Sequence, residues 1–134
     1  MGMTKRLSIA VLGLSLSFVP AEASDMTGSQ IKSLISGKSV YVKLNDEAAA
    51  GNHGVIYYGA DGKALFKGDQ GGVWHGTWSI KGNTACVEWV EEPANPCSRY
   101  KSSRGIVEII NIATSRPRGM ILRIKRGNVE NILP

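Results

Sequence analysis

The sequence predicts a mainly β protein, a small antiparallel β-barrel or sandwich of about seven or eight strands preceded by one short N-terminal helix. From residue 38 onward, apolar and polar residues alternate with the period of two that is typical of strands. Clusters of Gly, Asn, Asp and Pro interrupt this alternation at short intervals, as turns between hairpin strands do. Only one stretch, before residue 38, has a helical period. Sequential short strands with tight turns form antiparallel meanders, and a barrel is their simplest closed form.

The first 23 residues have the features of a secretory signal peptide. A pair of cations precedes an apolar stretch at residues 7–19, which is shorter than the roughly 20 residues needed to span a bilayer. Residues 21–23 then fit the small-x-small cleavage rule, although an uncleaved membrane anchor is the alternative interpretation. We therefore expect residues 24–134 to form a single secreted β-domain. It would be periplasmic or extracellular after cleavage near Ala23, with no transmembrane segment in the mature chain.

The one predicted helix lies within residues 26–38. Thr27 and Gln30 have the spacing of a capping box, in which each side chain binds the backbone amide of the other residue. Gly37 stands where a left-handed C-terminal cap is favoured. One helical face collects the apolar residues Ile31, Leu34 and Ile35.

The predicted strands follow one another with short loops between them. They cover residues 38–44, 53–59, 63–68, 73–80, 84–90, 98–102, 105–112 and 120–129. Asp61-Gly62 is a hairpin turn signal, because the favoured two-residue turn needs positive φ at both central positions. The prolines at residues 91–96 interrupt the ladder, and residues 115–119 are a predicted loop. In the last strand, Met120, Leu122 and Ile124 alternate with Ile121, Arg123 and Lys125.

All three tryptophans lie in the predicted hairpin at residues 73–90. The alternation places Trp78 and Trp89 on one buried face, where they would meet across the hairpin, and sends His75 and Cys86 to the other face. A tryptophan-lined ligand cavity is one alternative. A metal site is another, but His53, His75 and one acid are its only obvious ligands. We predict no metal and no cofactor.

No catalytic residues are predicted, because the chain has no nucleophile elbow and no phosphate-binding loop. We therefore expect a protein that is not an enzyme. An enzyme that uses the Trp/His-rich hairpin is kept as a minor hypothesis.

Cys86 and Cys97 are the two cysteines of the chain, so they allow a single intramolecular bridge. Exported compartments favour disulfides, and the spacing is far from the C-x-x-C of a thioredoxin-type pair. We predict a structural disulfide, with a free thiol or a redox pair as the alternatives.

The chain carries a formal net charge of +5, and basic residues outnumber acidic ones in its last third. This region is a candidate anion-facing surface, although a merely solvated face would have the same composition. No nucleic-acid motif is present. The candidate ligand-binding residues are the cations Arg116, Arg118, Arg123, Lys125 and Arg126, with Tyr57, Tyr58 and Tyr100 as exposed aromatic rings for stacking.

Several segments in order carry a resemblance to a known group. They are TGSQIKSLISGKSVY at residues 27–41, YYGADGK at 57–63, GTWSI at 76–80, ACVEW at 85–89 and NPCSRY at 95–100. They resemble small exported proteobacterial proteins catalogued as domains of unknown function, and the resemblance implies a lipocalin-like β-fold without an assigned activity. The Gly-x-Trp motif is also similar to that of lipocalins. SGKSVY at residues 36–41 is similar to the Ser-Gly-x-x-Tyr loop of small periplasmic lysozyme inhibitors.

The function predicted from the sequence is that of a secreted or periplasmic non-enzymatic binding domain. Its ligand would be an anionic envelope component, either a glycan or a lipid headgroup, or a protein. Arginine suits such ligands because its guanidinium donates two parallel hydrogen bonds to a phosphate or carboxylate. The alternative is a proteinaceous inhibitor of an envelope hydrolase such as lysozyme, although the positive charge disfavours a cationic lysozyme as its target.

Overall fold

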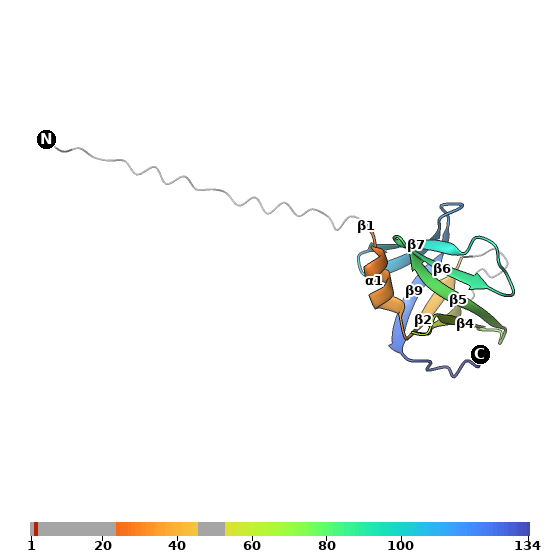
Figure 1. Cartoon of the computed structure of the whole chain (residues 1–134). Helices are drawn as coiled ribbons and strands as arrows, with labels where there is room; N and C mark the ends of the chain where they lie inside the picture. Colours follow the sequence, from red (N-terminus) through yellow and green to blue (C-terminus); the bar gives the residue numbers. More distant parts are fainter. Residues whose placement is uncertain (1, 3–23, 46–52) are drawn as a thin grey trace.

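The computed structural model describes residues 24–45 and 53–134, together with Gly2 (Figure 1). The predicted signal peptide, apart from Gly2, and most of the predicted loop at residues 45–52 therefore lie outside the described residues. Among the described residues, no helix has the length and apolar character needed to cross a membrane. The elements in chain order are β1 (Ser24–Asp25), α1 (Gly28–Ile35), β2 (Lys38–Leu44), β3 (His53–Tyr58), β4 (Lys63–Gly68), β5 (Val73–Lys81), β6 (Thr84–Trp89), β7 (Cys97–Ser103), β8 (Ile106–Asn111) and β9 (Pro117–Arg126).

Strands β2 to β9 form a closed antiparallel barrel, which confirms the predicted fold class and selects the barrel over the sandwich. Each strand from β2 to β9 pairs with the next in sequence, and the pairing of β2 with β9 closes the ring. The two-residue β1 adds to β7 beside the barrel, with Ser24 opposite Ser102.

Helix α1 covers one end of the barrel (Figure 1). The predicted capping box is present, since the Thr27 hydroxyl accepts from the Gln30 amide and the Gln30 side chain accepts from the Thr27 amide. Ile31 and Ile35 are fully buried against the strands. An eight-residue helix is marginal on its own in water, so this packing is what holds it in place.

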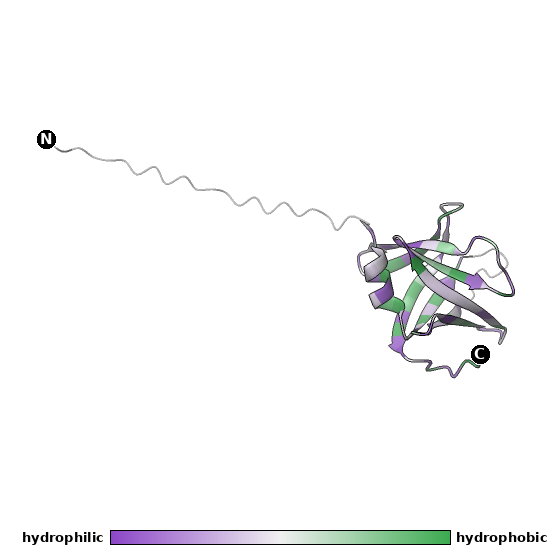
Figure 2. Ribbon diagram, in the orientation of Figure 1, coloured by the Kyte–Doolittle hydropathy of each residue, from purple (hydrophilic) through white to green (hydrophobic). Residues whose placement is uncertain are grey.

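Large side chains occupy the barrel interior. Figure 2 shows hydrophobic residues along the strands that surround it. The rings of Tyr58 and Trp78 meet edge to face with centroids 5.5 Å apart. The Trp78 indole donates to the Gly59 carbonyl at 2.8 Å, and the hydroxyls of Tyr58 and Tyr100 lie 3.3 Å apart. These contacts give the buried polar atoms partners within the core, as burial requires.

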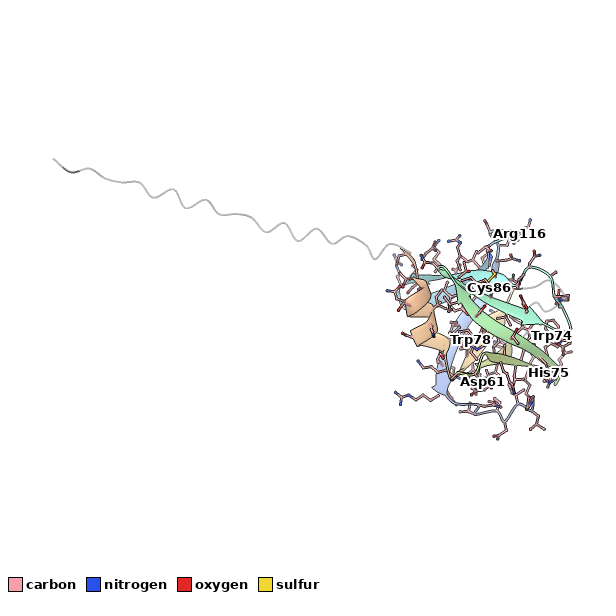
Figure 3. The ribbon with its side chains drawn as sticks, in the orientation of Figure 1. Asp61, Trp74, His75, Trp78, Cys86 and Arg116 are labelled. Carbon is pink, nitrogen blue, oxygen red and sulfur yellow. A yellow bond between two sulfur atoms is a disulfide. The ribbon has the colours of Figure 1, made fainter. Side chains whose placement is uncertain are left out.

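The predicted contact between Trp78 and Trp89 is wrong, because the hairpin register separates them. Trp78 lies opposite Val87, whereas Trp89 lies opposite Gly76. Trp89 instead meets Trp74, with ring centroids 6.2 Å apart, at the end of the barrel away from α1. Figure 3 shows Trp74 and Trp78 apart from each other along β5.

Strand β9 also differs from the prediction, because it begins at Pro117 inside the predicted loop. A bulge interrupts its pairing with β2, so that Ile121 and Ile124 both pack against the core. Leu122 is consequently 49% exposed, although strict alternation predicts it on the same face as Ile124.

The turn between β3 and β4 has a different geometry from the predicted two-residue hairpin. Only Gly62 of the Asp61-Gly62 pair has positive φ, at 88°, and the Gly59 amide donates to the Lys63 carbonyl across a longer loop.

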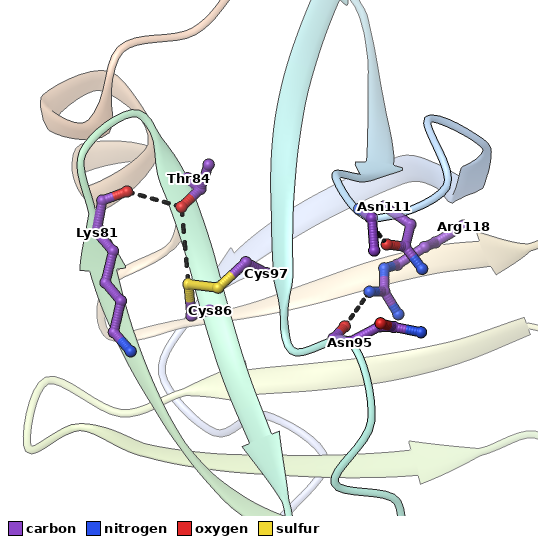
Figure 4. The surroundings of a disulfide bond; sticks show 8 residues. Lys81, Thr84, Cys86, Asn95, Cys97, Asn111 and Arg118 are labelled. Atoms are coloured by element: carbon purple, nitrogen blue, oxygen red, sulfur yellow. Dashed lines mark hydrogen bonds between the residues drawn. A yellow bond between two sulfur atoms is a disulfide. The ribbon is translucent and has the colours of Figure 1, made fainter.

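The predicted disulfide between Cys86 and Cys97 is present (Figure 4). It joins β6 to β7, whose ladder has only two residue pairs, Ala85 with Ser98 and Cys86 with Cys97. The other strand pairs of the barrel have longer ladders. The covalent bond therefore joins the two strands that share the shortest ladder of the barrel.

Replacing both cysteines by serine should lower the free energy of unfolding by about 3 kcal/mol, because the bridge closes a short loop in the unfolded chain. Urea unfolding with and without a reducing agent measures this cost. Reduction of the wild-type chain should reproduce the loss and leave the variant unchanged. Equal stability of the reduced and oxidised wild type would contradict a structural role for the bond.

Gly76→Ala should destabilise the barrel, because a Cβ atom there would overlap the Glu88 carbonyl oxygen on the neighbouring strand. The expected cost is on the order of 1–3 kcal/mol, as for other overpacked sites. Gly72→Ala is the matched control, since nothing lies within 4 Å of its added Cβ and its φ is not positive. Thermal unfolding of the two variants, measured side by side, should separate them clearly.

Candidate functional site

The cations predicted to form one site lie in separate places. Arg123 and Lys125 project from the outer surface of β9, while Arg126 is exposed at the end of that strand. Arg116 is exposed in the loop before β9 (Figure 3). Arg118, at the start of the strand, donates to the Asn95 carbonyl in the loop between β6 and β7 (Figure 4). These cations therefore lie at both ends of β9 and on its outer surface, and do not form one site.

The three predicted tyrosines do not form an exposed stacking surface. Tyr58 is 2% exposed and Tyr100 is 1% exposed, because both point into the barrel, so their predicted exposure is wrong. Burial raises the pKa of Tyr58 to about 12 and raises the pKa of Tyr100 well above its ordinary value. Tyr57 faces outward but is half-buried against Val55 and Leu65.

The half-buried side chain of Arg118 lies between the barrel interior and the loop that contains Asn95. Partial burial lowers the pKa of its guanidinium, and the charge of Arg118 in turn lowers the pKa of Tyr58, opposing the larger effect of burial. Its Nε atom is buried and has no hydrogen-bond partner among the described residues. This arginine is therefore largely committed to the barrel, unlike the cations further along β9.

Arg123 and Lys125 converge on Tyr41, a residue that the sequence analysis did not select. The register of β2 and β9 places Tyr41 opposite Arg123 and Ser39 opposite Lys125. The Arg123 guanidinium carbon lies 4.2 Å from the centroid of the Tyr41 ring, and the Lys125 ammonium nitrogen lies 5.5 Å from it. Cations at these distances are attracted by the ring face. We call Tyr41, Arg123 and Lys125 the cationic wall.

The C-terminal tail, residues 127–134, crosses the outside of the barrel next to the cationic wall. Ile132 is 4% exposed and packs with Val55 and Leu65, flanked by Tyr41 and Tyr57. Burial of one isoleucine contributes about 1.5–3 kcal/mol relative to leaving it in water. The Asn128 side chain both donates to the Ile132 carbonyl, at 2.8 Å, and accepts from the Ile132 amide, at 3.0 Å. These bonds close the tail into a compact turn.

Glu130 of the tail supplies the carboxylate next to the cationic wall. The Tyr41 hydroxyl donates to its Oε1 at 2.6 Å. That hydrogen bond, with burial and the charge of Glu130, raises the pKa of Tyr41, while the charge of Arg123 opposes the shift. The cationic wall thus already accommodates one carboxylate from the same chain.

A shallow groove of about 540 Å³ lies beside Pro134 of the tail. Pro134 lines it together with His75, Thr77, Glu88 and Val90 on the outside of β5 and β6. His75 contacts Glu91 twice, since its amide donates to the carboxylate at 3.0 Å and its Nδ1 lies 3.2 Å from Oε1. The hydrogen bond from the His75 amide is the main cause that lowers the pKa of Glu91.

In the part of the chain that the structure describes, no three residues among His, Cys, Asp and Glu are grouped to hold a metal ion. The histidine of the predicted metal set that lies on β5, His75, is engaged with Glu91. No protein-family model, curated protein or solved structure matches the chain. The resemblance to exported lipocalin-like domains therefore stays a prediction.

The stability of the protein should fall as pH rises above 10. The unfolded chain releases its tyrosine protons near pH 10, whereas buried Tyr58 keeps its proton up to about pH 12 and Tyr100 keeps its own well above pH 10. In that range the unfolded state binds fewer protons, so each tyrosine destabilises the fold by about 1.4 kcal/mol per pH unit. Urea unfolding at pH 9, 10 and 11 measures the slope.

The variant that carries both Tyr58→Phe and Tyr100→Phe is the control for this slope. It removes both partners of the buried hydroxyl pair, so its stability at neutral pH should change little. A variant that kept the full wild-type pH dependence would show that other groups cause it.

Proposed function

We propose that this chain is an exported, non-enzymatic binding domain that recognises an anionic partner at its cationic wall. The observation that carries the proposal is the arrangement of Arg123 and Lys125 over one tyrosine ring, beside a carboxylate held at 2.6 Å from the Tyr41 hydroxyl. A guanidinium stacked on a ring keeps its N–H donors at the edge of its plane, where they can bind carboxylate or phosphate.

Three further features support this proposal. Neither Arg123 nor Lys125 forms an ion pair within the described residues, whereas Arg99 is paired with Asp25 at 2.7 Å. The barrel interior is occupied by side chains, which favours recognition on the outer surface over carriage of a small molecule inside. The excess of basic over acidic residues adds long-range attraction for an anionic partner.

An exported location is supported by the disulfide, because such bonds persist in oxidising compartments. The partner would then be a component of that space that carries carboxylate or phosphate groups. This interpretation keeps the sequence-based expectation of an anionic ligand. It moves the site from the whole basic segment to two of its cations and Tyr41.

The variant with Arg123→Gln and Lys125→Gln should bind anionic probes at least about tenfold more weakly, since it removes the two charges nearest the ligand. Suitable probes are phosphatidylglycerol vesicles, a polyuronate and a glutamate-rich peptide. Affinities measured by titration at about 50 and 200 mM salt should fall with salt for the wild type, because screening weakens exposed charges.

The matched control is the variant with Lys81→Gln and Arg116→Gln, which loses the same net charge at exposed positions away from Tyr41. It should bind nearly as tightly as the wild type. If both variants lost affinity equally, only net charge would matter and no localised site would exist.

A further inference from the structure

We propose that the C-terminal tail is an internal ligand of the cationic wall, and that the external partner is an extended acidic and aliphatic protein segment that displaces it. This inference rests on the proposed function and specifies its partner. The tail places one carboxylate, that of Glu130, on the Tyr41 hydroxyl, and one aliphatic side chain, that of Ile132, in the adjacent apolar site. The wall therefore has a charged subsite and an apolar subsite two residues apart on one bound segment.

The apolar subsite favours a protein segment over a polysaccharide. Ile132 is 4% exposed and lies against the side chains of Val55 and Leu65, which offer no hydrogen-bonding groups to a sugar. A carboxylate followed two residues later by a branched aliphatic residue satisfies both subsites. Leu133, by comparison, is 78% exposed, so the residue after the aliphatic position is not recognised.

The groove lined by Pro134 offers a displacing segment a further surface on the barrel. The tail starts at Gly127, whose amide donates to the Gly37 carbonyl at 2.9 Å, and its last residue lines the groove on the outside of β5 and β6. A displacing segment can continue along this groove past His75 and Val90. Extra contacts there would let an external segment compete with a tethered one.

The tethered tail should strongly suppress binding of an external segment. A short linker gives its attached segment an effective concentration of about 1 mM, so a free peptide of the same sequence competes poorly. The start of the tail is tied to the barrel, because the Ser39 hydroxyl donates to the Gly127 carbonyl and accepts from the Val129 amide. Beyond that point, the contacts with the wall and the adjacent apolar site are those of Glu130 and Ile132. Loosening the tail should expose the wall without disturbing the barrel interior, to which it contributes no residue of the main core.

The test uses a fluorescent peptide with the sequence of residues 127–134 and measures its anisotropy on titration with the complete chain. The chain variant with Glu130→Gln and Ile132→Ala should bind this peptide at least about tenfold more tightly than the wild type, because its own tail no longer occupies the wall. The chain with Leu133→Ala is the matched control and should bind like the wild type. Should the double variant fail to fold, Glu130→Gln alone makes the same comparison, with an expected gain of about threefold.

Changes in the peptide report on the two subsites separately. We call the chain variant with Glu130→Gln and Ile132→Ala the loosened chain. Compared with the unchanged peptide, peptides with Glu130→Gln or Ile132→Ala should bind the loosened chain at least about tenfold more weakly, and a peptide with Leu133→Ala should bind it equally well. Adding Arg123→Gln and Lys125→Gln to the loosened chain should weaken binding, because both cations lie over the Tyr41 ring whose hydroxyl binds the carboxylate. Equal affinity of the peptide for the wild-type and loosened chains would overturn the inference. A dimer of the chain in light scattering would also overturn it, because the tail would then bind a second copy of the chain.

Failure of this inference is distinguishable from failure of the proposed function. If the peptide does not bind the loosened chain but vesicles or polyuronate still bind in a manner that depends on Arg123 and Lys125, the partner is not a protein segment and the inference alone is wrong. If no anionic probe depends on these two cations, both are wrong.

Discussion

Closure of the sheet is the constraint on which the rest of the structure depends. The pairing of β9 with β2 turns a run of hairpins into a ring, and the ring has an inside and an outside. Inside, Tyr58, Trp78 and Tyr100 fill the space. The two tyrosine hydroxyls pair with each other, and the Trp78 indole donates to the Gly59 carbonyl. Outside, the same ladder brings Arg123 to Tyr41. A core and a candidate binding wall therefore arise from one set of backbone hydrogen bonds.

Local features of the fold were predictable from the sequence because they depend on neighbouring residues. The capping box of Thr27 and Gln30 and the left-handed Gly37 involve contacts within a few positions, and the structure has both. The disulfide was predictable because only two cysteines exist. The choice of barrel over sandwich was not, since it depends on β2 meeting β9, strands more than seventy residues apart in the sequence.

The candidate site was predictable in composition but not in arrangement. Charge along β9 pointed to Arg123 and Lys125, but nothing in the sequence singled out Tyr41, which the register places opposite Arg123. No local signal gives the register between the two strands, and the bulge in their ladder changes which residues share a face. The contact of Glu130 with Tyr41 depends on the path of a tail without regular secondary structure, which has no period to detect.

The ladder between β2 and β9 also protects the protein against self-association. If β9 detaches, β2 keeps only β3 as a neighbour and offers a row of free amides and carbonyls beside Val40 and Val42, which are fully buried in the closed barrel. Such an unpaired apolar strand is a template for joining another chain. Loss of β9 by proteolysis or truncation would therefore turn the barrel into a precursor of aggregates.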